Sequence, residues 1–129
     1  MERFENKVAI VTGAAGGIGS AIAARLAREG ATVVVSDVNL EAAQGVAESI
    51  CREGGKAVAI AADIAQGDAC RALVQQTVEQ LGTLDILVNN AGINRRGNLL
   101  ALSEDDWHTS FTVNLDSMFH LCRAVLPIM

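Results

Sequence analysis

Short apolar runs alternate with segments of helical periodicity along almost the whole chain, and this alternation constrains the fold more than any other feature. The runs are rich in β-branched residues, as strands covered on both faces are, and we expect strands over 7–12, 32–36, 56–61 and 84–90. Apolar residues three or four positions apart predict helices over 17–29, 39–53, 68–81 and from 103 towards 127. Because parallel strands need crossover connections, this order predicts a doubly wound parallel sheet with helices on both faces, a three-layer α/β/α domain.

The 129 residues are expected to form one domain. No uninterrupted apolar run approaches the roughly 18 residues that a membrane-spanning helix needs. The first residues, MERFENK, include acidic side chains and lack the apolar region of a secretory signal. We therefore expect a soluble, cytoplasmic protein with no membrane partner.

Charge and cysteine content argue against two classes of function. The formal net charge is −5 and the only adjacent basic pair is Arg95-Arg96, whereas a nucleic-acid-binding protein normally has a basic face. Cys51, Cys70 and Cys122 are odd in number and widely spaced, so we expect buried thiols in a reducing compartment. No CxxC or His-Cys cluster indicates a metal site. The sequence therefore predicts neither a nucleic-acid partner nor a bound metal.

The last expected helix follows Ser103-Glu104-Asp105-Asp106, an S-x-x-D start signal. Trp107 is expected to anchor this helix in the core, with an interface role as the alternative. His108 and His120 have no paired nucleophile or carboxylate pattern of the kind a catalytic triad shows. We therefore expect both histidines at a surface or an interface.

Four glycines lie within seven positions at the junction of the first strand and the first helix, in the stretch VAIVTGAAGGIGSAI. A glycine inside an element costs roughly 0.5–1 kcal/mol relative to alanine, so the cluster needs a physical reason. A helix N-terminus presents free N–H groups and about half a positive charge, which suits a pyrophosphate if no side chain stands in the way. We expect Gly13 to make the tight turn, Gly17 to admit the phosphates and Gly19 to let the helix lie close to the sheet. The alternative is a flexible turn without a ligand.

The chain resembles the short-chain dehydrogenase/reductase family over nearly its whole length, through three motifs that occur in the same order and with similar spacing. The motifs are T-G-x-x-x-G-I-G at 12–19, Asn-Asn-Ala-Gly at 89–92, and Asn114 within VNLDSMFHLCRAVLPIM. The resemblance implies a Rossmann-like dinucleotide-binding domain in an oxidoreductase that transfers hydride between a nicotinamide cofactor and an alcohol or ketone. It also implies a homo-oligomer, a dimer or tetramer, in the full-length form.

The resemblance also assigns roles to individual residues of this chain. Asp63 would hydrogen-bond the adenine amino group, Ile64 would pack near the ring, and Asn90 would lie near the ribose. Asn114 would support a water in the catalytic proton relay. The remaining expected cofactor contacts are Ile18, Ala91 and Gly92. The alternatives are an N-cap of the third helix for Asp63 and a plain strand-ending turn for 90–92.

Asp37 closes the second expected strand, 18 positions after Gly19, which is close to the roughly 20 expected for a ribose-binding carboxylate. Its carboxylate can accept hydrogen bonds from both adenosine hydroxyls of NAD, but it would repel the 2′-phosphate of NADP by up to ~4 kcal/mol at ~4 Å. No basic residue in the glycine loop or directly after the strand offsets that charge. We therefore expect NAD as the cofactor, with NADP less favoured. A solvated or helix-capping Asp37 is the alternative.

The family's catalytic Tyr-x-x-x-Lys pair and serine have no counterpart here, because the chain contains no tyrosine and its only lysines are Lys7 and Lys56. We therefore expect residues 1–129 to be the dinucleotide-binding, N-terminal part of a longer single-domain enzyme, inactive by themselves. Two alternatives from other classes are a non-catalytic NAD-binding module and a structural fragment that needs a partner to complete its sheet.

Overall fold

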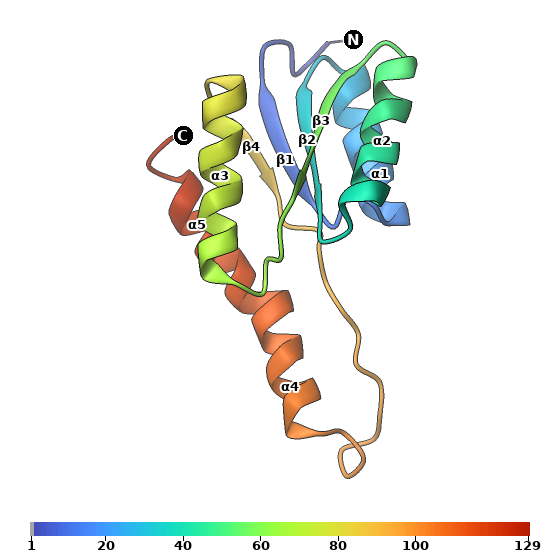
Figure 1. Cartoon of the computed structure of the whole chain (residues 1–129), viewed down its shortest axis with the longest axis vertical. Helices are drawn as coiled ribbons and strands as arrows, with labels where there is room; N and C mark the ends of the chain where they lie inside the picture. The colour runs from blue at the N-terminus through green and yellow to red at the C-terminus, as the bar shows by residue number, and fades with distance from the viewer. Residues whose placement is uncertain (1) are drawn as a thin grey trace.

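The computed structural model describes residues 2–129, and a four-stranded parallel sheet lies at its centre (Figure 1). The strands are arranged in the order β3-β2-β1-β4. Their bounds are β1 Val8–Thr12, β2 Thr32–Asp37, β3 Lys56–Ala61 and β4 Ile86–Val88. The chain moves outwards from β1 to β3 and then crosses back to β4, so a topological switch point lies beside β1, where such sheets bind ligands. The predicted doubly wound α/β fold is confirmed.

Helices cover both faces of this sheet (Figure 1). One face is covered by α1 (Gly17–Arg28) and α2 (Leu40–Arg52), and the other by α3 (Gly67–Leu81) and α5 (Ser117–Val125). α4 (Glu104–Phe111) extends beyond the carboxyl ends of the strands and joins α5 through a π-helical turn, η1 (Thr112–Asp116). Within residues 2–129, no helix combines the length and the apolar character that crossing a membrane requires.

β4 is shorter than the expected strand over 84–90, and side-chain hydrogen bonds are present at both of its ends. At the start, the Asp85 carboxylate accepts a hydrogen bond from the Val8 N–H at 2.9 Å. At the end, the Asn90 N–H donates to the Thr12 hydroxyl at 3.1 Å. Three residues of regular ladder are left between these two side-chain contacts.

Two helix boundaries also differ from the expectation. α3 begins at Gly67 after Gln66, so Asp63 does not cap it, and the alternative given for that residue is wrong. The last helix is interrupted by η1, where the wider turn separates α4 from α5. The apolar pattern predicted one continuous helix and did not indicate this turn.

α1 contacts the sheet through small residues. Its buried positions are Gly19, Ala23 and Ala27, whereas Ile18, at the start of its apolar stripe, is 75% exposed. The larger members of that stripe, Ile22 and Leu26, are only half-buried. The helix axis can therefore lie close to the sheet, and the residues that give α1 its sequence periodicity lie at its sides.

Two expectations about single side chains are wrong. Trp107 is 51% exposed on α4 and packs on Phe111, with 5.0 Å between ring centroids, so it does not anchor a core. Among the three free cysteines only Cys70 is buried, whereas Cys51 is exposed and Cys122 is half-buried. Burial raises the pKa of the Cys70 thiol.

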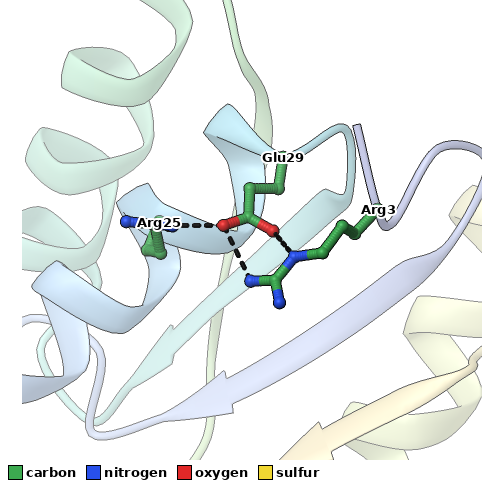
Figure 2. A network of polar contacts seen from close by, with 3 residues as sticks. All are labelled: Arg3, Arg25 and Glu29. Atoms are coloured by element: carbon green, nitrogen blue, oxygen red, sulfur yellow. Dashed lines mark hydrogen bonds and ion pairs between the residues drawn. The ribbon is translucent and has the colours of Figure 1, made fainter. Parts of the chain in front are cut away.

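The N-terminal segment is fixed to the end of α1 by the carboxylate of Glu29 (Figure 2). This carboxylate accepts hydrogen bonds from the guanidinium groups of Arg3 and Arg25. A negative charge at a helix C-terminus opposes the helix dipole, and the two arginines offset it. Hydrogen bonds from Arg3 and then from Arg25 lower the pKa of Glu29 from its ordinary 4.5 to about 2.

Candidate functional site

A cleft of about 510 Å³ opens at the carboxyl ends of the strands, beside the switch point. Ligand pockets in proteins commonly measure ~300–1,000 Å³, so this cleft can hold a small molecule. Its walls include every residue expected to contact a cofactor, namely Gly13, Gly17, Ile18, Gly19, Asp37, Asp63, Ile64, Asn90, Ala91 and Gly92. The structure therefore brings together residues that lie up to 79 positions apart in the sequence.

The N-terminus of α1 forms one wall of the cleft and has the features of an anion site. Its N-cap, Gly16, provides no side-chain hydrogen bond, and the first turn contains no acidic residue. The N–H groups of a first helical turn have no partner within the helix. A Cβ built at Gly17 would meet no atom within 4 Å, so the space beside this residue is open. An anionic group can therefore approach the backbone here without displacing a side chain.

Gly13 and Gly19 have a different role, since both lie where backbone segments are in contact. Gly13 has φ +61°, and a Cβ there would lie 2.7 Å from the Cα of Ala91. A Cβ at Gly19 would lie 2.4 Å from the Gly13 carbonyl oxygen. The expected tight turn at Gly13 and the close approach of the helix at Gly19 are both present.

Thr12 joins the glycine loop to the end of β4, a role that the sequence analysis missed. Its hydroxyl accepts hydrogen bonds from the N–H groups of Asn90 and Ala91, both at 3.1 Å, and donates to the Val88 carbonyl at 3.3 Å. The side-chain amide of Asn90 donates to the Thr12 carbonyl at 3.0 Å and to the Gly13 carbonyl at 3.3 Å. A polar residue ending an otherwise apolar strand is the one sequence signal that could have indicated this role.

The Asp37 carboxylate lies at the end of β2 and contacts two backbone segments. Oδ2 accepts a hydrogen bond from the Ala15 N–H at 3.2 Å, and Oδ1 accepts one from the Asn39 N–H at 3.1 Å. The N-cap of α2 is Asn39, whose side chain accepts from the Ala42 N–H at 3.0 Å. Asp37 is therefore not the helix cap that was considered as its alternative role.

Asp63 and Ile64 follow β3 and also line the cleft. The Asp63 carboxylate accepts one hydrogen bond, from the Ala65 N–H at 3.0 Å. Ile64 is 6% exposed and belongs to the core under α3, while part of it lines the cleft. This pair combines a carboxylate that has further acceptor capacity with an apolar surface.

Asn114 lies in η1 and holds the segment that leaves the cleft. Its Oδ1 accepts a hydrogen bond from the Ile93 N–H at 2.8 Å, and its Nδ2 donates to the Ile93 carbonyl at 2.9 Å. A Cβ at Gly92 would lie 3.2 Å from the Asn114 Oδ1, so this glycine allows the contact. Asn114 is not itself among the residues that line the cleft.

A doubly wound sheet with a glycine-rich turn at the start of α1, beside the switch point, defines the class of dinucleotide-binding α/β proteins. Comparison with known sequences narrows this class. The profile of the family described as "short chain dehydrogenase" matches residues 7–129. The chain therefore belongs to the short chain dehydrogenase family of oxidoreductases, which bind a nicotinamide cofactor and act on small molecules.

Relatives of known sequence or structure agree with this assignment. The chain is 40% identical over 122 residues to a hydroxy(phenyl)methylsuccinyl-CoA dehydrogenase subunit of Thauera aromatica, covering 95% of this chain and 49% of the relative. It is 43% identical over 126 residues to cyclohexanol dehydrogenase of an Acinetobacter strain, covering 97% and 50%. A metagenomic short-chain oxidoreductase solved with NADP superposes with a TM-score of 0.93 at 37% identity, covering 98% and 57%. The chain spans about half the length of the curated relatives it matches.

The cleft fits the cofactor of this family on a further observation. Ser36 is 1% exposed, lines the cleft, and has a hydroxyl without a hydrogen-bond partner within residues 2–129. A buried hydroxyl in a folded protein normally has a partner, so a polar group is expected beside it. The open space at Gly17 and the unpaired Ser36 hydroxyl together suit a ligand that has both phosphate and hydroxyl groups. No sequence signal marks Ser36, because it is one residue of a buried strand.

Proposed function

We propose that this chain is the cofactor-binding part of an NAD-dependent oxidoreductase whose substrate is an alcohol or ketone. The observation that carries the proposal is the Asp37 carboxylate, which lies in the same cleft as the free N-terminus of α1. In this proposal the first turn of α1 binds the pyrophosphate in the space in front of Gly17, and Asp37 accepts hydrogen bonds from the adenosine ribose. When bound, NAD supplies the hydride acceptor for oxidation of an alcohol.

Other residues of the cleft would orient the rest of the dinucleotide. Asp63 would accept a hydrogen bond from the adenine amino group, with Ile64 against the ring. The backbone of Asn90, Ala91 and Gly92 would lie along the nicotinamide half. Support comes from the positions of these residues, because all of them line one cleft.

The preference for NAD over NADP is part of this proposal and rests on charge. A 2′-phosphate would have to lie beside the Asp37 carboxylate, and two like charges ~4 Å apart repel by up to ~4 kcal/mol at an effective dielectric constant near 20. The neighbouring positions of the loop and of β2 are Ala14, Ala15, Gly16, Val38 and Asn39, none of which is basic. One solved relative binds NADP, so family membership alone leaves the preference open.

Turnover would need residues that this chain does not contain. A ketone that accepts hydride becomes an alkoxide, and its protonation by a general acid typically contributes ~10²–10⁴-fold to the rate. The sequence contains no tyrosine, and Asn114 uses its side chain to hold Ile93. We therefore propose that Asn114 belongs to the proton relay of the longer enzyme, and that residues 1–129 by themselves are inactive. The matched relatives are about twice as long as this chain, which supports the proposal that residues 1–129 are part of a longer, single-domain enzyme.

A homo-oligomer and a cytoplasmic location complete the proposal. Support for the oligomer comes from a row of exposed apolar side chains along α4, η1 and α5: Trp107, Phe111, Leu115 and Phe119. Three free thiols are in keeping with a reducing compartment.

Calorimetric titration with NADH and NADPH tests the cofactor assignment. We expect NADH to bind about tenfold more tightly or better, which corresponds to ~1.4 kcal/mol. In the double variant Asp37→Ala with Val38→Arg, the ratio of the two affinities should shift towards NADPH. Equal or tighter binding of NADPH by the unmodified chain would contradict the NAD assignment. Absence of binding for both would contradict the cofactor site itself.

A further inference from the structure

The Asp37 carboxylate connects two elements that are distant in sequence. It accepts hydrogen bonds from the Ala15 N–H in the glycine loop at 3.2 Å and from the Asn39 N–H at the start of α2 at 3.1 Å. Ala15 lies 22 positions before Asp37, so the first contact is tertiary rather than part of a local turn. The side chain is half-buried, and a hydrogen bond to a charged acceptor is stronger there than in water.

The rest of the glycine loop is held by contacts that do not involve this carboxylate. The Ala14 N–H donates to the Ser36 carbonyl at 3.0 Å, and the Asn90 side-chain amide donates to the carbonyls of Thr12 and Gly13. Ala15 is therefore the last residue fixed from outside before the N-cap of α1. Its position determines how Gly16 and the free N–H groups after it face the cleft.

The acceptor capacity of a carboxylate allows this contact to persist when a ligand binds. A carboxylate has two oxygens and about four lone-pair sites. Backbone N–H groups of Ala15 and Asn39 use one site on each oxygen. One site on each oxygen remains, which is what two neighbouring ribose hydroxyls need.

We propose that Asp37 is a positioning residue for the glycine loop as well as the ribose contact, so that one carboxylate couples the pyrophosphate half of the cleft to the adenosine half. The ribose contact rests on the proposed function. The hydrogen bond from the Ala15 N–H to the Asp37 carboxylate, called the tether below, is a property of the chain alone. A ligand without any ribose should therefore still bind less well when the Asp37 carboxylate is removed. A substitution that removes this negative charge would then weaken the binding of both NADH and NADPH, and it would also change the ratio of their affinities.

Amide hydrogen exchange of Ala15, measured by NMR without any ligand, tests the tether directly. Asp37→Asn keeps the shape of the side chain but leaves one acceptor oxygen for two N–H donors. We expect the exchange of the Ala15 or the Asn39 amide to become about tenfold faster or more, and Asp37→Ala to accelerate both. The matched control is Glu41→Gln, which removes the same charge from the exposed first turn of α2, where the carboxylate makes no hydrogen bond to the loop within residues 2–129. Unchanged exchange of both amides in the Asp37 variants would overturn the proposal.

Binding of inorganic pyrophosphate and of ADP-ribose separates this inference from the proposed function. We expect Asp37→Asn to weaken the binding of both probes by about fivefold or more, and Glu41→Gln to leave both unchanged. If Asp37→Asn weakens ADP-ribose alone, the carboxylate contacts only the ribose and the tether has no role in phosphate binding. If the unmodified chain binds neither probe, the proposed function fails, and the exchange of the Ala15 amide still decides whether the tether exists. Circular dichroism of each variant checks that the sheet remains folded.

Discussion

The two faces of the sheet are packed with side chains of different size. Under α1 and α2 the helices contribute mainly alanine to the core, with Ala23 and Ala27 from α1 and Ala43 and Ala47 from α2. Under α3 and α5 the helices contribute larger side chains, namely Cys70, Leu73, Val74, Leu121 and Val125. The strands supply valine to both faces but isoleucine, Ile10 and Ile60, only to the face under α3 and α5, so strands and helices both contribute to the difference.

The difference in size corresponds to a difference in role. Small residues let α1 lie close enough to the sheet for its N-terminus to reach the carboxyl end of β1, where the glycine loop turns. Bulky residues under α3 and α5 bury more apolar area per helix, and each such side chain stabilises the fold by ~1.5–3 kcal/mol. One face therefore positions the cleft, and the other contributes more of the stability. Enlarging a residue should damage the first face most, and truncating one should damage the second most.

Gly19→Val should have the largest effect, because it enlarges the position where α1 is closest to the loop. A Cβ there would lie 2.4 Å from the Gly13 carbonyl oxygen and 2.8 Å from the Ala14 Cα, both backbone atoms. We expect a loss of about 4 kcal/mol or more in the free energy of unfolding, measured by urea titration. The matched control is Gly17→Val in the same first turn of α1, where a Cβ would meet no atom within 4 Å, so the fold should be retained. Equal stability of the two variants would mean that α1 does not depend on close approach.

Leu121→Ala tests the opposite face. Leu121 is 0% exposed between α5 and the sheet, and its truncation should cost about 2–5 kcal/mol through lost burial and a new cavity. Urea titration measures the change. Leu126→Ala serves as the control, since Leu126 is 68% exposed at the end of α5 and should change stability by about 0.5 kcal/mol or less. A loss at Leu121 no greater than at Leu126 would contradict a stabilising role for this face.

Ala23→Val adds two methyl groups between α1 and the sheet. Ala23 is 0% exposed, and overpacking at such a position should cost about 1–3 kcal/mol, measured by thermal unfolding. The same change at exposed Ala21 in α1 isolates the effect of valine on the helix itself. If both substitutions lower the stability equally, the space between α1 and the sheet can accommodate a larger side chain. The proposed difference between the two faces would then be wrong.

Acid should weaken the α1 face through Glu29, with the smallest expected effect. Because its pKa is lowered from 4.5 to about 2 in the folded chain, the ionised carboxylate stabilises the fold above pH 4.5. This contribution should be lost as the pH falls from 4.5 through about 2. The difference in Tm between the unmodified chain and Glu29→Gln should therefore be largest above pH 4.5 and disappear near pH 2. A difference that does not depend on pH would show that the Glu29 charge does not contribute.

The sequence alone predicted the order of strands and helices, because periodicity is a local property, and the family resemblance supplied most of the residues expected to contact the cofactor, all of which line the cleft. It did not predict that Thr12 and Asp37 hold the glycine loop, since their partners lie 76 to 79 and 22 positions away. It also placed Trp107 in the core, although α4 extends past the sheet and this side chain is 51% exposed and packs on Phe111. Small buried residues such as Ala23 carry little hydrophobic signal, so the face of α1 that meets the sheet could not be read from its periodicity.

The pairing of β1 with β4 has a consequence for the order of events during synthesis. Ala9 pairs with Ile86, so the two strands that flank the switch point are separated in the chain by three helices and two strands. Contacts between such distant residues form late, because the intervening chain must be ordered before they can be made. The glycine loop and Asp37 leave the ribosome long before Asn90 does, and until then the Asn90 amide cannot hold the Thr12 and Gly13 carbonyls. We therefore expect a nascent chain to acquire nucleotide affinity in one late step, when the residues of β4 emerge, rather than gradually as the first half of the sheet folds.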